Sequence, residues 1–525
     1  MVLIYLALFL YVLTSAVLLF LHFQKKEEGQ TWLAALFCCF ASFILILLSP
    51  LAGTVSNNPI IWFTSRSMVL TIDPVWGRFD WLIMVLLSLS TLVFILTSYI
   101  QRERKGFDRR TTFFLFSTTI TGILTSITQR FVFLPFLIFL LDCTQIFYQF
   151  SEDRELFSTR GQVIPLIIKL SSIILLGYAA ILVERSGEPD SITTNPLFLI
   201  ILIAMLHLLA EFLQRITTKK APNIKDQWMT LINTVFMLKM LSLLQQYPSI
   251  TSDSKMIVIL VVLLLVSFVM LFLWIVRPVD KTKDLFASGI SITLASSFLF
   301  LGVREELVVF VLPIFFLWMN QQAGPNKKYL NILLLAIQTL FLIGVPFSPW
   351  YALNNNIVDG TKLSAGSVIL LIMEGLYLAG FILHQVKEYN RKDHSDDEHH
   401  TKSETSSASW LILAVLAGTL LRGFVTSANW VHISWLHYLP AACLLFIPVY
   451  SLIYSRRASL VQTKSTYHVS GIQILDKTTQ IILVIVNIFR QVFDGLSALL
   501  EGDGGLVWAI ILLILLLTFY RGLVG

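Results

Sequence analysis

The sequence predicts an all-α polytopic membrane protein with about sixteen transmembrane helices. Hydrophobic residues make up 56% of the 525 residues, charged residues make up only 13%, and the mean hydropathy is +0.78. A soluble chain of this length would not expose so much apolar surface with so few charges. We therefore expect a multi-pass protein of a bacterial-type cytoplasmic (inner) membrane, surrounded by the lipid bilayer.

Apolar runs of about 17 to 24 residues define the predicted spans, because about 20 residues of helix cross the hydrocarbon of a bilayer. The spans before residue 220 are expected near 2–23, 31–50, 79–100, 111–129, 131–148, 163–184 and 195–214. The next is WMTLINTVFMLKMLSLLQQY, residues 228–247, which holds Lys239 near its middle. The rest are expected near 255–276, 285–303, 305–320, 329–350, 365–386, 409–427, 434–454 and 504–522. The first run has no basic residues before it, which favours a retained span over a cleaved signal peptide.

Lysine and arginine are concentrated in the odd-numbered loops between these spans. The densest group is Arg102, Arg104, Lys105, Arg109 and Arg110. By the positive-inside rule the odd loops are cytoplasmic, and both termini are then outside. The net charge of +6 follows from this loop asymmetry, so it does not indicate a nucleic-acid partner.

The cysteines indicate neither a disulfide framework nor a metal or iron–sulfur site. All four lie inside apolar segments, where thiols usually pack as small hydrophobes: Cys38, Cys39, Cys143 and Cys443. No glycine-rich nucleotide fingerprint follows a predicted strand, so we expect no cofactor. Residues 388–408 are polar and of mixed charge, which predicts a disordered cytoplasmic loop. A metal site at His394, His399 and His400 is the alternative, although a solvated tether has the same composition.

Residues 467–500 mix apolar positions with Asp476, Lys477, Arg490 and Asp494. This distribution predicts a partly amphipathic helix that lies along the membrane or against other spans. The glycines of EGDGGLVW would end this helix before the last span begins.

Ionisable residues inside the predicted spans are the candidate functional residues, because a charge in hydrocarbon is costly unless it faces a partner or a water-filled path. They are Asp142, Lys169, His207, Glu211, Lys239 and Glu374. Each also has a structural interpretation: an ion pair, a hydrogen bond between helices, or a position at a helix end. Arg422 is a further charge that could extend to a headgroup.

The order of several motifs resembles the antiporter-like membrane subunits of complex I (NADH:quinone oxidoreductase), of Mrp antiporters and of membrane-bound hydrogenases. The motifs are MVLTIDPVWGRFDWLIMVLLSL (68–89), IIKLSSIILLGYAAILVERSG (167–187), KAPNIKDQWMTLINTVFMLKM (220–240), DKTKDLFASGISITLASSFLFLG (280–302) and LFLIGVPFSPWYALNNN (340–356). Each motif is weak alone, and their order and spacing carry the resemblance.

The resemblance implies two related antiporter-like half-bundles, a lateral amphipathic helix and a final anchoring span. The expected regions are 1–110 (three N-terminal spans), 111–250 and 251–387 (the halves), 388–408 (loop), 409–456 (C-terminal spans), 457–503 (linker and lateral helix) and 504–525 (last span). The resemblance also implies a proton path. In it, a carboxylate on span five pairs with a lysine on span seven, a lysine or histidine on span eight links onward, and a lysine or glutamate on span twelve ends the path.

Position by position, the family pattern is only partly present in this chain. Asp142 matches the carboxylate of span five, and Lys239 matches the lysine of span eight. The lysines implied on spans seven and twelve fall at Met205 and Asn354. His207 and Glu374 are the proposed replacements. The twelfth helix is expected to break at Gly344, Pro346 and Pro349.

Three functional hypotheses follow. The first is a subunit that translocates H⁺ or Na⁺ within a redox-driven complex, with other membrane subunits as partners. The second is a non-conducting scaffold derived from the same family, suggested by Met205 and Asn354. The third is an unrelated polytopic enzyme such as a lipid-linked glycosyltransferase. The third would require paired acidic residues in a large outer loop, and loop 51–78 holds only Asp73 before Asp80.

Overall fold

A computed structural model of the chain describes a bundle of α-helices. The described residues are 2–23, 28–52, 60–64, 69–72, 78–105, 109–128, 131–152, 160–185, 200–207, 209–211, 224–243, 254–276, 283–299, 305–322, 328–342, 350 and 365–393. The expected C-terminal spans, the lateral helix, Arg422 and the histidines of the 388–408 loop all lie outside them.

The elements follow one another along the chain as apolar helices joined by polar connections. The N-terminal elements are α1 (Val2–Phe23), α2 (Glu28–Leu48), the 3-10 turn η1 (Ser49–Ala52), strands β1 (Ile60–Thr64) and β2 (Val69–Ile72), and α3 (Arg78–Lys105). Next come α4 (Arg109–Ile127), α5 (Phe133–Glu152), α6 (Arg160–Arg185), a helical segment within 200–211, and α8 (Ile224–Leu243). The last are α9 (Ser254–Val276), α10 (Lys283–Leu299), η6 (Glu305–Val311), α11 (Leu312–Gln322), α12 (Lys328–Leu342) and α14 (Ala365–Asp393).

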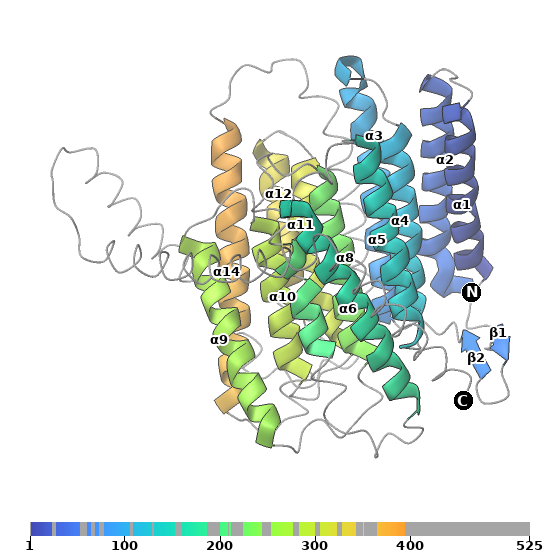
Figure 1. The fold of residues 1–525 in the computed structure, drawn as a ribbon. Helices are drawn as coiled ribbons and strands as arrows, with labels where there is room; N and C mark the ends of the chain where they lie inside the picture. The colour runs from blue at the N-terminus through green and yellow to red at the C-terminus, as the bar shows by residue number, and fades with distance from the viewer. Residues whose placement is uncertain are drawn as a thin grey trace.

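The helices run side by side, with α1 and α2 at one edge of the bundle and α9 and α14 at the other (Figure 1). Between these edges, α8 packs against α4, α10 and η6. The interior helices are buried along their whole apolar length: in α3, 94% of the window Asp80–Thr97 is buried. A helix that is apolar on every side is expected in such a position.

Serine and threonine hydroxyls are common in the described interior, where they form hydrogen bonds. Most donate to a carbonyl one turn back in their own helix, as Thr118 does to Phe114 at 2.9 Å. Some link neighbouring helices, such as Thr91 of α3 and Thr119 of α4, whose hydroxyl oxygens are 2.8 Å apart. Small hydroxyl residues therefore let these helices approach closely.

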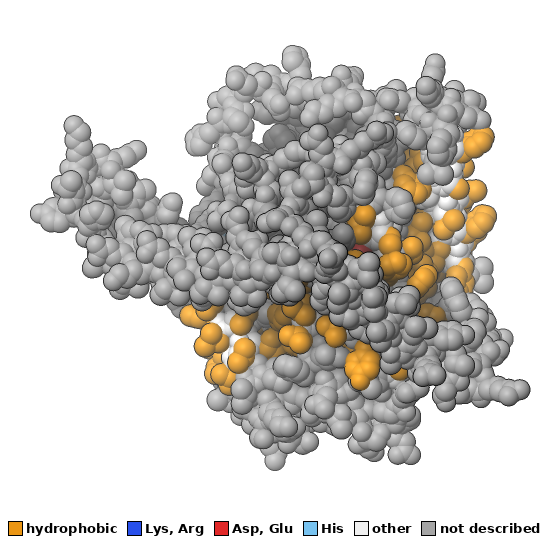
Figure 2. Space-filling model, viewed as in Figure 1, with side chains coloured by type: hydrophobic (Ala, Val, Ile, Leu, Met, Phe, Trp, Pro, Cys, Tyr) orange, Lys and Arg blue, Asp and Glu red, His pale blue; other side chains and the backbone are white. Residues whose placement is uncertain are grey.

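The outer helices expose apolar side chains instead of charges. On α9, Val261, Leu265, Phe268 and Phe272 are 44% to 62% exposed and recur at helical spacing on one face. Figure 2 shows hydrophobic side chains over α9 and along the edge formed by α1 and α2. Such faces are stable in lipid and not in water. By length and composition alone, two described helices hold an 18-residue membrane-spanning window, Asp80–Thr97 and Val368–Gln385, while other apolar helical stretches are shorter.

The prediction of a helical, multi-pass membrane protein is thereby confirmed, with two corrections. The region 51–78, expected to be a loop, contains the antiparallel hairpin β1–β2, in which Ile60 pairs with Ile72. Two short runs rich in β-branched residues on either side of a brief connection favour this hairpin. Residues 388–393, expected to belong to a disordered loop, are part of α14, which continues to Asp393. Residues 388–393 include good helix formers, which extend the last turns. The division into two half-bundles stays a prediction.

The contact between α14 and α9 depends on the absence of a side chain at Gly380. A Cβ there would lie 2.8 Å from Cζ3 of Trp274, an indole ring that also packs against Tyr377 and His384. We expect Gly380→Ala to destabilise the protein by about 1 to 3 kcal/mol, because the closely packed indole ring of Trp274 cannot shift to make room for the added methyl group. Thermal denaturation in detergent measures this effect.

Gly122→Ala on α4 is the matched control. Its Cβ would meet only the ends of two flexible side chains, Cδ1 of Leu87 at 2.9 Å and Cδ1 of Ile232 at 3.3 Å. It should cost less than Gly380→Ala, and the reverse order would contradict the packing described for α9 and α14.

Candidate functional site

Lys239 forms a buried ion pair with Asp80. Its Nζ donates to Oδ1 of Asp80 at 2.6 Å, and the two side chains are 3% and 11% exposed. Asp80 lies in the first turn of α3, and α8 ends at Leu243, four residues after Lys239. A carboxylate near a helix N-terminus and an ammonium near a helix C-terminus are both stabilised by the helix dipoles. This pair therefore lies near helix ends, whereas the sequence interpretation placed Lys239 near the middle of a span.

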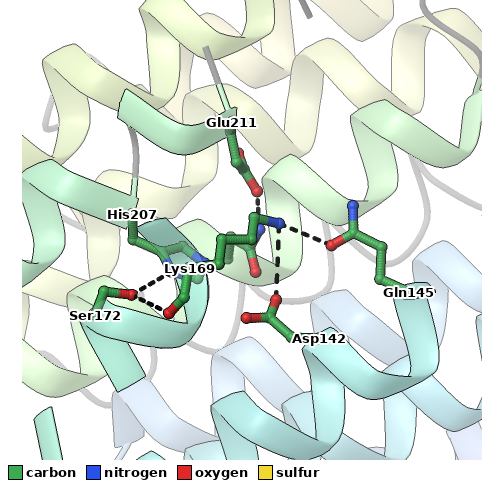
Figure 3. Close-up of polar contacts among 7 residues, drawn as sticks. Asp142, Gln145, Lys169, Ser172, His207 and Glu211 are labelled. Carbon is green, nitrogen blue, oxygen red and sulfur yellow. Dashed lines mark hydrogen bonds and ion pairs between the residues drawn. The ribbon is translucent and has the colours of Figure 1, made fainter. Parts of the chain in front are cut away.

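A second ion pair lies between α5 and α6 (Figure 3). Lys169 Nζ is 3.7 Å from Oδ1 of Asp142 and donates to Oε1 of Gln145 at 2.9 Å. Asp142 and Gln145 are one turn apart, so both side chains project from the same face of α5. Neither carboxylate oxygen of Asp142 has a hydrogen-bond partner, although the side chain is buried. A buried carboxylate without hydrogen bonds is costly and is uncommon away from functional sites.

His207 extends this group from the helical segment 200–207. Its Nδ1 is 3.3 Å from the hydroxyl oxygen of Ser172, which donates to the carbonyl of Lys169 at 2.7 Å. The other ring nitrogen, Nε2, is buried without a hydrogen-bond partner. Figure 3 shows Asp142, Lys169 and His207 close together around the junction of these helices. An imidazole nitrogen without a hydrogen-bond partner therefore belongs to the same group of side chains as the Asp142–Lys169 ion pair.

The remaining acidic candidates contact neutral donors. The Glu211 carboxylate accepts a hydrogen bond from the amide of Asn233, which lies midway along α8. The Glu374 carboxylate on α14 accepts one from the indole N–H of Trp350, and Glu374 is fully buried. Hydrogen bonds to a carboxylate offset part of the cost of its burial.

Hydroxyl groups connect α8 to α10 and α10 to α14. The hydroxyl oxygens of Thr234 and Ser288 are 2.7 Å apart, and those of Ser291 and Tyr377 are 2.8 Å apart. Ser288 and Ser291 are one turn apart on α10, and Tyr377 follows Glu374 by one turn on α14. These four side chains, here called the polar strip, link α8 to α10 and α10 to α14 as two hydroxyl pairs.

The structure brings together Asp142, Lys169 and His207, and it separates Lys239 from them by pairing it with Asp80. The partner of Asp142 is a lysine on α6, where the family resemblance implied a lysine on span seven. Met205, at that implied position, is half-buried and packs against apolar side chains. Gly344, Pro346, Pro349 and Asn354 lie outside the described residues.

Sequence reasoning missed five hydrogen-bonding or ionic partners: Asp80, Gln145, Ser172, Asn233 and Trp350. Spacing along the sequence could have identified two of them. Gln145 follows Asp142 by three residues and Ser172 follows Lys169 by three residues, so each shares a helix face with a candidate charge.

Comparison with known proteins agrees with this architecture at the level of structure. A chain of the Mrp complex from Dietzia sp. DQ12-45-1b superposes with a TM-score of 0.59 over 99% of this chain, at 11% identity. A chain of the archaeal membrane-bound sulfane sulfur reductase, a respiratory membrane complex, gives 0.61 over 98% at 10% identity. This chain therefore shares its fold with these two membrane-complex chains.

A chain of a second respiratory complex has a similar fold. A chain of respiratory complex I from Thermus thermophilus matches with a TM-score of 0.51 and 14% identity, over 80% of this chain and 98% of that one. This chain covers 99% of the sulfane sulfur reductase chain but only 63% of the longer Mrp chain. No protein-family model and no curated protein matches the sequence. The similarity is therefore in the arrangement of the helices, because few residues are identical.

Metal-binding residues do not gather within the described ranges, where no group of three or more His, Cys, Asp or Glu could hold an ion. The cysteines of this part of the chain, Cys38, Cys39 and Cys143, are free thiols. The chemistry of the described helices is therefore that of ion pairs, an imidazole and hydroxyl groups.

The Asp80–Lys239 pair predicts a stability effect. Lys239→Met should destabilise the protein by about 3 to 5 kcal/mol, because it leaves the Asp80 carboxylate buried without its cation. Asp80→Asn together with Lys239→Met should recover part of this loss, since no unpaired charge remains. Denaturation in detergent of both single variants and the double variant measures the coupling.

Ser242→Ala is the control on the same helix, because the Ser242 hydroxyl donates to the carbonyl of Lys239 within α8, at 2.8 Å. A double variant as unstable as the sum of the two single variants would contradict a coupled ion pair.

Proposed function

We propose that this chain is a proton-translocating antiporter-like membrane subunit of an NADH:quinone oxidoreductase-like, redox-driven complex. The observation that carries the proposal is the Asp142–Lys169 pair, a buried carboxylate and ammonium at 3.7 Å with no hydrogen bond to the carboxylate. The antiporter-like fold supports the setting, since the similar chains come from the Mrp complex, complex I and an archaeal respiratory complex.

A buried pair of this kind can couple proton movement to charge movement. When Asp142 takes up a proton, its attraction for Lys169 is lost, and the ammonium then depends on its other contacts. When the proton leaves, the carboxylate attracts the ammonium again. In a medium of low dielectric constant these changes in electrostatic energy are several times larger than in water. A small displacement of one side chain therefore changes the proton affinity of the other.

The proposed path continues from this pair through His207 and along the polar strip to Glu374. His207 offers an unoccupied ring nitrogen, and the hydroxyls of Thr234, Ser288, Ser291 and Tyr377 lie between α8 and α14. Hydroxyl groups both donate and accept hydrogen bonds, so they can pass a proton without carrying a charge. Glu374 would be the terminal acceptor, in place of the lysine that the family pattern implies at Asn354.

A proton is the favoured ion over Na⁺. A sodium site requires several oxygen ligands without a competing cation, and Lys169 already lies beside the Asp142 carboxylate. We expect a bacterial-type cytoplasmic membrane with both termini outside, and partner subunits that supply the electron transfer. This chain would contribute no redox site of its own.

A second candidate function is a non-conducting scaffold subunit with the same fold. Met205 favours it, because an apolar, half-buried residue occupies the position where the family pattern implies a lysine. The two functions differ in whether the buried charges of α5 and α6 are needed for ion movement or only for assembly.

Asp142→Asn and Lys169→Met should each reduce proton uptake by about a hundredfold, the usual scale for loss of a proton-transfer group. The purified complex is reconstituted in vesicles with a pH-sensitive dye, and its assembly is checked by size-exclusion chromatography. Cys143→Ala, next to Asp142 on α5, should leave uptake unchanged. Normal uptake in both charge variants of an assembled complex would favour the scaffold function. A parallel measurement with a Na⁺-sensitive dye in which the variants lose only Na⁺ uptake would identify the ion as Na⁺.

Glu374→Gln should reduce proton uptake by about a hundredfold while the complex stays assembled. The amide oxygen still accepts the hydrogen bond from Trp350, so packing is kept and only proton exchange is lost. Trp350→Phe is the complementary control, because it removes the donor and keeps the acid. Uptake in Glu374→Gln equal to that of the unmodified complex would remove Glu374 from the path.

A further inference from the structure

Two lysine–aspartate pairs in this chain have different geometries. Lys239 and Asp80 are in direct contact at 2.6 Å, the distance of a charge-assisted hydrogen bond. Lys169 and Asp142 are 3.7 Å apart, although both are as deeply buried. Burial alone therefore does not explain the longer distance between Lys169 and Asp142. Another acceptor must compete with the Asp142 carboxylate for the Lys169 ammonium.

Gln145 is that competitor. Its Oε1 accepts a hydrogen bond from Lys169 at 2.9 Å, and its side chain is only 9% exposed. It lies one turn beyond Asp142 on the same face of α5, so the ammonium is within reach of both acceptors (Figure 3). A neutral amide attracts an ammonium less than an ionised carboxylate does, and more than a protonated carboxyl group does.

We propose that Gln145 is a positioning residue that gives the Lys169 ammonium a second hydrogen-bond acceptor. Lys169 then alternates between Gln145 and Asp142 as Asp142 gains and loses its proton. This inference deepens the proposed function and rests on it. With the Asp142 carboxyl protonated, Lys169 binds Gln145. When the O–H bond of Asp142 breaks and the proton passes to Nε2 of His207, the carboxylate is left charged and the ammonium moves onto it.

The charged and titratable groups around Lys169 come from each neighbouring element. Asp142 comes from α5, while His207 and Glu211 come from the helical segment 200–211. The side chain that α8 contributes next to Glu211 is the neutral Asn233. Ser172 lies between Lys169 and His207, since its hydroxyl contacts both the Lys169 carbonyl and Nδ1 of His207. Movement of the ammonium toward Asp142 would therefore change the field at His207 directly.

The test compares Gln145→Met with Gln145→Glu in the reconstituted complex. Methionine keeps the length of the side chain and removes the amide acceptor, so Lys169 should stay on Asp142. Glutamate keeps an acceptor of the same length and adds a charge, so Lys169 should stay at position 145. The carboxylic-acid infrared band of Asp142, identified by its loss in Asp142→Asn, reports the protonated fraction at fixed pH.

We expect the Asp142 band to fall several-fold in Gln145→Met and to rise in Gln145→Glu, after subtraction of the Gln145→Glu/Asp142→Asn spectrum. In both variants proton uptake should fall about tenfold, because the ammonium no longer alternates. If Gln145 had only a structural role, the intensity of the Asp142 band would not change in opposite directions in the two variants. If Gln145→Met does not assemble, the rise of the band in Gln145→Glu decides the outcome.

Thr144→Val is the matched control, because its hydroxyl bonds to the Leu140 carbonyl of the same helix at 2.8 Å. An unchanged band and unchanged uptake in assembled Gln145→Met would overturn the role of Gln145. Normal uptake in Asp142→Asn would instead overturn the proposed function, so the two failures are distinguishable.

Discussion

The Asp142–Lys169 pair is the interaction on which the rest of the site depends. Inside hydrocarbon a polar group must find its partner within the protein, because no bulk water is present to solvate it. Lys169 satisfies this requirement mainly through Gln145, and the Asp142 carboxylate satisfies it only by proximity to the ammonium. The surrounding helices must hold three side chains from α5 and α6 in register, since loss of either charge leaves the other uncompensated.

The contrast with Asp80 and Lys239 separates two uses of the same chemistry. At the ends of α3 and α8 the pair is in contact and is supported by both helix dipoles, which suits a fixed link between helices. In the middle of α5 and α6 the pair is open and shares its ammonium with an amide. The first arrangement stabilises one geometry, whereas the second leaves two geometries close in energy.

Chains with a comparable fold are only 10% to 14% identical to this one, so the same helix arrangement is compatible with very different residues. Helix packing in a membrane requires small residues, satisfied hydroxyls and apolar outer faces, and many sequences meet those requirements. The position of a charge is less constrained than its need for a partner. A lysine on α6 can therefore serve the carboxylate of α5 where the family pattern has one on span seven, and Met205 can fill the vacated position with apolar packing.

The sequence by itself determined that the chain is a helical membrane protein, where most of the described spans lie, and which buried ionisable residues need partners. Those properties follow from local composition, since apolar length and intramembrane charge are readable one segment at a time. It failed at the hairpin β1–β2, at the continuation of α14 to Asp393 and at the partners of Lys239 and Asp142. Only the tertiary structure decided those partners, because Asp80 and Lys239 are 159 residues apart and meet only when α3 packs near α8.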